Sequence, residues 1–128
     1  MKVRTLSPFT LLLSILAFTV SCKEEKKESA KPALPWEWEP EDPELVLGKS
    51  VYAETCGLCH NEGEEGAPMI HHKSEWDQRM QKGEATLIDH AINGFQGTYG
   101  HMPPKGDNKS LTDEQVTAAV KFMIATPR

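Results

Sequence analysis

The sequence predicts an all-α protein in which four short helices and their loops wrap around one apolar group. Four segments carry apolar residues at helical spacing together with helix start or stop residues. No segment alternates convincingly at the period of two that a half-buried strand requires. The region 44–128 also has little aliphatic content, so on its own it would build only a thin core. An apolar group held inside this domain would supply the missing volume.

The amino-terminal residues have the features of an export signal. Two basic residues precede an apolar stretch, 6–20, which is shorter than the roughly 20 residues that a membrane span needs. We therefore predict a signal peptide at residues 1–21 and an exported protein. Cys22 resembles the lipidated cysteine of bacterial lipoproteins, although Thr19 stands where leucine is usual. The alternatives are an ordinary signal peptide cut nearby or an uncleaved anchor.

Residues 22–43 combine the lipidation site with a linker. Mixed charges are followed by four prolines, a composition that cannot bury a core and favours an extended, semi-rigid spacer. Trp36 and Trp38 are unusual in such a tether. They could pack onto the surface of the domain, or they could form a docking site for a partner protein.

The charge of the exported chain makes nucleic acid an unexpected partner. The formal net charge is −5, and removal of the signal peptide with its two basic residues takes it to −7. A chain this acidic repels the phosphate backbone. A protein partner with a basic patch, or one that binds through apolar contacts, fits the charge better.

The first helix of the domain is predicted at residues 43–54. Pro43 suits the first helical position, and Asp42 can cap the free N–H groups of the first turn. Gly48 costs the helix about 1 kcal/mol relative to alanine, and such a glycine often marks the close approach of another helix. The helix leads directly into Cys56, so we expect it to deliver the next segment as an attachment loop.

Three further helices are predicted downstream. One spans residues 74–82, with Ser74 as the expected cap, and the next spans residues 84–93. The last helix has the clearest start signal, because Thr112 and Gln115 stand at the positions of a capping box.

Residues 56–60 read Cys-Gly-Leu-Cys-His, the attachment pattern of a c-type haem. In this pattern Cys56 and Cys59 form thioether bonds to the porphyrin, and His60 ligates the iron. The same two cysteines could instead form half of a zinc site or a redox dithiol. However, no second C-x-x-C and no pair of histidines at zinc-ligand spacing (H-x3–5-H) follows, and no strand of a thioredoxin-like unit flanks the motif. With Cys22 lipidated and two thiols on haem, no free thiol remains among the three cysteines.

A second axial ligand must come from elsewhere in the chain. Met102 is the best candidate, because it stands in the Gly/Pro-rich loop 94–106, where a thioether has no helix to pack and the following prolines stiffen the backbone. A ligating imidazole usually donates its other N–H to an acceptor, and the Pro68 carbonyl is suitably placed in sequence. The full set of candidate ligands is Met69, His71, His72, Met80, His90, His101, Met102 and Met123.

The order of these motifs resembles that of the class I cytochrome c family, and more closely that of the cytochrome c5 group. The resemblance covers about residues 44–126. It rests on the C-x-x-C-H motif, on Gly-Ala-Pro at 66–68, on Trp76-x-x-Arg79, on Met-Pro-Pro-Lys-Gly at 102–106, and on the capping sequence that follows.

The resemblance implies a small class I cytochrome c fold around one covalent haem c, with the first and last helices crossing at Gly48, Tyr52 and Phe122. It also implies His60 and Met102 as axial ligands, Cys56 and Cys59 as thioether anchors, and Pro68 as the carbonyl partner of His60. Arg79, together with Trp76, would meet a haem propionate, although a plain surface role is the alternative for Arg79. His101 is a competing ligand that would give a bis-histidine centre.

These observations predict a monomeric electron carrier without catalysis of its own. It would pass single electrons between redox proteins, such as membrane oxidoreductases or oxidases, on the periplasmic side of a membrane to which lipid anchors it. The alternatives are a haem peroxidase or gas sensor in which Met102 dissociates, and a dithiol oxidoreductase that uses Cys56 and Cys59.

Overall fold

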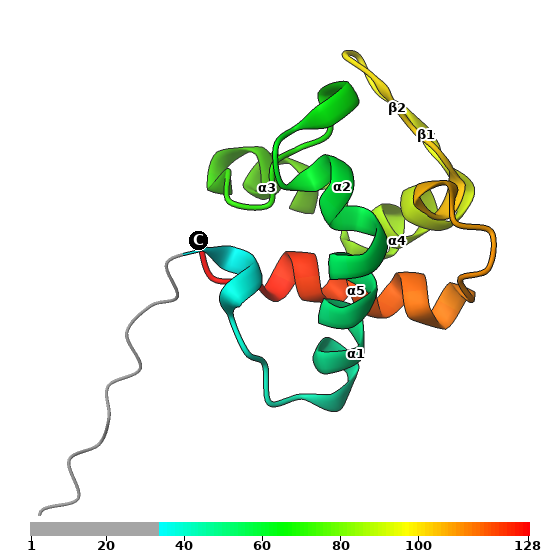
Figure 1. Cartoon of the computed structure of the whole chain (residues 1–128). Helices are drawn as coiled ribbons and strands as arrows, with labels where there is room; N and C mark the ends of the chain where they lie inside the picture. The colour runs from blue at the N-terminus through cyan, green and yellow to red at the C-terminus, as the bar shows by residue number, and fades with distance from the viewer. Residues whose placement is uncertain (1–33) are drawn as a thin grey trace, which may run out of the picture.

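The computed structural model describes residues 34–128, and within them the fold is mainly helical, as predicted (Figure 1). The predicted signal peptide and Cys22 lie outside the described residues. None of the described helices is long and apolar enough to cross a membrane. The elements in chain order are η1 (Pro35–Glu37), α1 (Pro43–Val51), η2 (Tyr52–Cys56), α2 (Gly57–His60), η3 (Glu64–Gly66), α3 (Lys73–Met80), α4 (Glu84–Asn93), β1 (Phe95–Gln96), β2 (His101–Met102), η4 (Pro104–Asp107) and α5 (Asp113–Ala125).

The first helix is longer than predicted. It begins as expected after Asp42, whose carboxylate accepts a hydrogen bond of 2.8 Å from the Glu44 N–H. It does not stop at residue 54, because a π-helical turn, η2, joins α1 to α2 and carries the helix to His60. No proline or left-handed glycine interrupts this stretch, and Gly57 adopts an ordinary helical conformation. The attachment motif is therefore helical, not a loop.

The first and last helices cross, and Gly48 permits their close approach (Figure 1). A Cβ atom at Gly48 would lie 2.0 Å from the Ala118 carbonyl oxygen. One turn further on, the Tyr52 and Phe122 rings pack with their centroids 5.5 Å apart. The structure thus bears out the predicted crossing at these positions.

The remaining helices follow the sequence signals to different degrees. Helix α5 begins with the predicted capping box: the Gln115 N–H donates to the Thr112 hydroxyl, and the Thr112 N–H donates to the Gln115 side chain. Helix α4 has the predicted bounds. Helix α3 begins one residue earlier than predicted and ends at Met80; His72, not Ser74, occupies the cap position and makes no side-chain capping bond.

Part of the predicted loop 94–106 is a short antiparallel hairpin. Strand β1 pairs with β2 in the register Phe95 to Met102 and Gln96 to His101. The Gly97 N–H donates to the Gly100 carbonyl at 2.8 Å and closes the turn. Strands of two residues are too short to show an alternating pattern, so no periodic signal predicted them.

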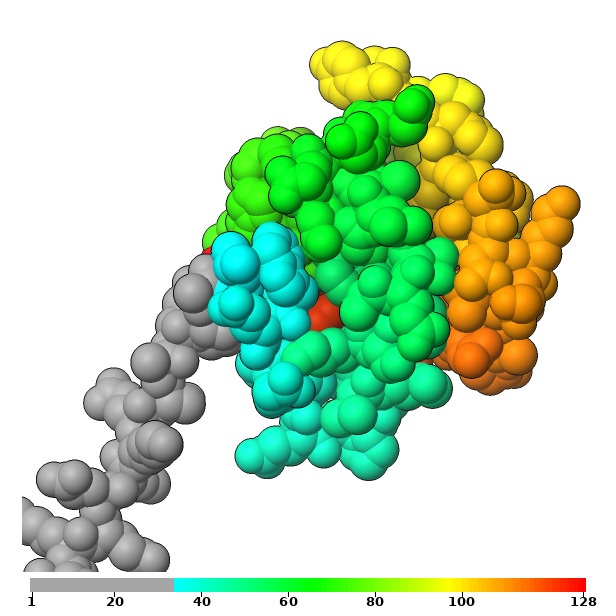
Figure 2. All heavy atoms as spheres, in the orientation of Figure 1, coloured from blue at the N-terminus to red at the C-terminus, as the bar shows by residue number. Residues whose placement is uncertain are grey.

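The predicted linker is packed on the domain from residue 34 onward. The Trp38 ring stacks on Phe122, with centroids 5.8 Å apart and planes 13° apart, and the Trp36 ring meets His71 edge to face. Both indoles are half-buried against the core cluster around Tyr52. In Figure 2 this segment, in cyan, covers one flank of the molecule. We call residues 34–42 the tryptophan strap; burial of two indoles outweighs the preference of this polar sequence for solvent.

Candidate haem site

The predicted site residues of the described chain line one cavity of about 480 Å³. Its walls come from η2 and α2, from the turn η3, from α3 and α4, from the hairpin and from α5. The predicted residues among the lining are Cys56, Cys59, His60, Pro68, Arg79 and Met102. The fold therefore gathers residues that are up to 46 positions apart in the chain around one space.

His60 is held in one orientation by the backbone. Its Nδ1 lies 2.8 Å from the Pro68 carbonyl oxygen, so Nδ1 carries the proton and donates it. Nε2 is then the unprotonated nitrogen and is available as a ligand. Burial lowers the pKa of the imidazole, which keeps the ring in the neutral form that binds a metal.

The wall behind His60 is made by Trp76. The two rings lie 6.2 Å apart between centroids, and Trp76 is 6% exposed. The indole N–H donates to the Met69 carbonyl oxygen at 2.9 Å. Because this N–H is already bonded, Trp76 serves as an apolar wall in this structure and its donor is not free for a propionate.

The two thiols lie three residues apart, close to one turn, on the helical segment that ends at His60. Both are half-buried and both are free, with no disulfide between them. Burial raises the pKa of the Cys56 thiol to about 11. A redox dithiol needs a thiol whose pKa is depressed, so this environment does not favour dithiol exchange.

Met102 enters the cavity from strand β2. Successive side chains of a strand point to opposite faces, and here Met102 packs against the cluster of Ala91, Val116 and Val120 while His101 is exposed. His101 also contributes to the lining, but its side chain is exposed. The hairpin, which the sequence did not reveal, is therefore what separates these two neighbouring ligand candidates.

The structure reduces the set of candidate second ligands. Of the eight candidates, only His90, His101, Met102 and Met123 line the cavity. Met123 is a buried core residue of α5, and the His90 ring is stacked on Phe95 with centroids 4.0 Å apart. Of these four candidates, Met102 is the residue that lies in a short strand between loops and whose side chain faces the cavity.

Arg79 lies at the edge of the cavity and already has protein partners. Its Nη1 donates to the Glu75 carbonyl oxygen at 2.9 Å and lies 3.8 Å from the Glu75 carboxylate. The side chain is 37% exposed. This geometry suits the plain surface role and also leaves the guanidinium beside the cavity, so the propionate contact stays a prediction.

Lys82 and Phe95 also line the cavity, and they were not among the site residues predicted from the sequence. Lys82 lies with its Nζ 5.3 Å from the centre of the Phe95 ring, and both residues line the cavity with His90. The signal that could have found Lys82 is its spacing of three residues from Arg79, which favours one face of a helical segment.

The donor set and the cavity fit a c-type haem. Two thiols, an oriented imidazole and a thioether converge on one space, and Leu87, Ala91 and Val120 add apolar walls. The volume lies in the range of cofactor pockets. These residues supply the covalent anchors, the ligand nitrogen and the sulfur that such a group requires.

Comparison with known proteins finds relatives that are named as cytochromes. Residues 43–123 match the family model described as Cytochrome C oxidase, cbb3-type, subunit III. The chain is 44% identical over 81 residues to cytochrome c-555 of Chlorobaculum tepidum. The matched stretch covers 63% of this chain and 75% of that protein. It is 32% identical over 75 residues to cytochrome c5 of Ectopseudomonas mendocina, covering 57% and 82% respectively.

A solved structure shares the fold. It is a chain from the crystal structure of an electron transfer complex of nitrite reductase with cytochrome c, matched with a TM-score of 0.54 and 28% identity. The match covers 65% of this chain and 93% of that one.

Proposed function

The chain belongs to the class I cytochrome c family and carries covalent haem c as an electron carrier, and on this premise we propose that it passes single electrons between membrane-associated periplasmic redox proteins. The observation that carries the proposal is the convergence of Cys56, Cys59, His60 and Met102 on one cavity, with His60 oriented by the Pro68 carbonyl. The likeness to a cytochrome c from a complex with nitrite reductase supports a protein as the redox partner.

In this proposal the residues of the chain have distinct tasks. The bound haem supplies an iron that gains and loses one electron. Cys56 and Cys59 would hold the group covalently, and His60 and Met102 would ligate its iron, a ligand pair that raises the reduction potential. The hydrogen bond from His60 to Pro68 fixes the imidazole ring and increases its basicity as a ligand. Trp76 and Val120 exclude water from the group.

The spectrum of the purified holoprotein tests the ligand assignment. We expect a low-spin haem with the methionine–iron charge-transfer band of the oxidised state. Met102→Ala should remove this band. Met80→Ala is the matched control, since Met80 does not line the cavity, and it should keep the band. A high-spin wild-type haem would instead favour the peroxidase or gas-sensor alternative, and a haem-free protein would favour the dithiol alternative.

Membrane attachment is a separate part of the proposal and rests on the sequence of residues 1–22. Lipid on Cys22 would hold a monomeric domain at the membrane while the charged linker lets it reach its partners. Cys22→Ser should move the haem-containing protein from the membrane fraction to the soluble fraction. If the membrane fraction is unchanged, lipidation of Cys22 is wrong, and the electron-carrier proposal is unaffected.

A further inference from the structure

We propose that the cavity rim formed by Leu58, Glu64, Glu65 and Tyr99, together with the exposed Glu62 next to it in sequence, docks a redox protein that presents lysine and arginine side chains around an apolar centre; these five residues are here called the acidic rim. This inference rests on the proposed electron-carrier function and names the chemistry of its partner. It commits to a basic protein surface as the occupant.

Two large apolar side chains are exposed at the mouth of the cavity. Leu58, between the two cysteines, is 75% exposed, and Tyr99, near the tip of the hairpin, is 91% exposed. Both contribute to the lining. Exposed apolar side chains at a functional opening, bordered by polar residues, are typical of a contact surface for another protein.

The carboxylates beside them are not neutralised within the described chain. Glu62, Glu64 and Glu65 are exposed, and none of them belongs to an ion pair among residues 34–128. Elsewhere in the same part of the chain, acidic residues do have basic partners; examples are Glu44 with Lys121 and Asp113 with Lys105. The negative potential at this side of the mouth is therefore available to steer a cationic surface.

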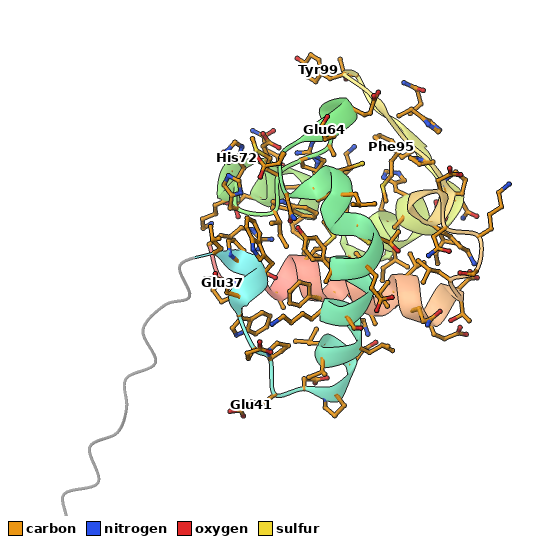
Figure 3. The ribbon with its side chains drawn as sticks, in the orientation of Figure 1. Glu37, Glu41, Glu64, His72, Phe95 and Tyr99 are labelled. Carbon is orange, nitrogen blue, oxygen red and sulfur yellow. The ribbon has the colours of Figure 1, made fainter. Side chains whose placement is uncertain are left out.

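The acidic rim is built from two segments that pack tightly on each other. A Cβ atom at Gly100 would lie 1.6 Å from the Glu65 carbonyl oxygen, and one at Gly66 would lie 2.8 Å from the Tyr99 carbonyl oxygen. Only glycines allow the hairpin tip to rest on the turn η3. Figure 3 shows Glu64 and Tyr99 on these neighbouring segments at the same end of the molecule. A surface that is already ordered loses less entropy when it binds.

Two basic residues that also line the cavity, Arg79 and Lys82, make the charge around its mouth uneven. Arg79 is held by Glu75, and Lys82 lies over Phe95. The rim is thus negative where η3 and the hairpin tip meet, and it is less so near Arg79 of α3. A partner would bind with its basic side chains over Glu64 and Glu65 and its apolar centre over Leu58 and Tyr99, close to the predicted thioether anchors.

The experiment measures electron transfer by stopped flow with the holoprotein and two probes, the cation hexaammineruthenium(II) and a basic mitochondrial cytochrome c. The triple variant Glu62→Gln/Glu64→Gln/Glu65→Gln should react about tenfold more slowly with both probes at low ionic strength, with the difference lost at high salt. The control Glu41→Gln/Glu84→Gln/Glu114→Gln makes the same change in net charge at exposed residues away from the cavity, and it should leave the rates near those of the wild type.

Tyr99→Ala separates apolar docking from steering. It should slow the reaction with the basic cytochrome severalfold and leave the reaction with hexaammineruthenium(II) unchanged. Equal rates for the rim and control triple variants would overturn the inference. Haem spectra of the wild type and of all variants are recorded first. A normal low-spin spectrum together with unaltered rates in the rim variant refutes only the docking role of the acidic rim. The absence of a low-spin haem in the wild type refutes the proposed function itself.

Discussion

The helix crossing makes a quantitative prediction for Gly48→Ala. In an isolated helix alanine is favoured over glycine by about 1 kcal/mol. In this fold the new Cβ would lie 2.0 Å from the Ala118 carbonyl oxygen and 2.6 Å from its carbonyl carbon, where carbon atoms normally stay about 3.5 Å apart. The obstacle is backbone, so no side-chain rotation relieves it and the helices must separate. Overpacking of this kind costs about 3 kcal/mol at the upper end of its usual range.

The two effects have opposite signs, and the steric effect is larger. The free energy of unfolding should therefore fall by about 2 kcal/mol, which for a domain of this size lowers the melting temperature by about 8–16 °C. Thermal unfolding of the holoprotein, followed by helical circular dichroism, measures the change. Ser50→Ala is the matched control, because Ser50 is exposed on the same helix and should change stability by no more than about 0.5 kcal/mol. A Gly48→Ala protein more stable than the wild type would refute the close-contact reasoning.

Three further predictions concern the strap, a helix cap and a buried phenol. Trp38→Ala should lower the free energy of unfolding by about 2 kcal/mol, since half of a stacked indole is buried, whereas Tyr99→Ala, which removes an exposed ring, should leave it unchanged. Thr112→Ala should cost about 1 kcal/mol through loss of the capping bond, and Thr112→Ser should restore it; equal losses in both variants would contradict the capping role. Burial holds the pKa of Tyr52 above its ordinary value near 10, so the unfolded chain loses this proton first and the wild-type stability should fall as the pH rises above about 10. Tyr52→Phe should flatten that fall in an alkaline denaturation series, and an unchanged slope would show that Tyr52 does not titrate in this way.

Local signals in the sequence predicted the elements whose causes are local. The Thr112–Gln115 box and the Asp42 cap are formed by residues within one turn of each other, so sequence spacing alone identifies them. Gly48 was a weaker signal for the helix crossing, because a glycine within a helix can have several explanations. Its presence destabilises the helix, and the close approach of α5 explains why glycine is needed there.

The parts that the sequence did not reveal depend on tertiary contacts. The hairpin is held by a register of two residues and by the fit of Gly100 on η3, neither of which leaves a periodic pattern. The tryptophan strap has the composition of a solvated linker, and only the position of Phe122 shows where Trp38 is buried. The orientation of Met102 follows from the hairpin, so the sequence could propose the residue but could not separate it from His101 by geometry.

The buried core of this small domain is divided into two clusters that both border the cavity. The buried residues form two clusters, one around Tyr52 and Phe122 and the other around Ala91 and Val116. Both clusters contribute walls to the cavity, the first through Trp76 and Met123 and the second through Leu87, Ala91, Val120 and Met102. A haem in that space would join two small cores into one and would bury apolar surface that each cluster otherwise turns toward the cavity. The low aliphatic content of the sequence and the position of the cavity therefore have the same explanation: a haem in the cavity would supply part of the hydrophobic core.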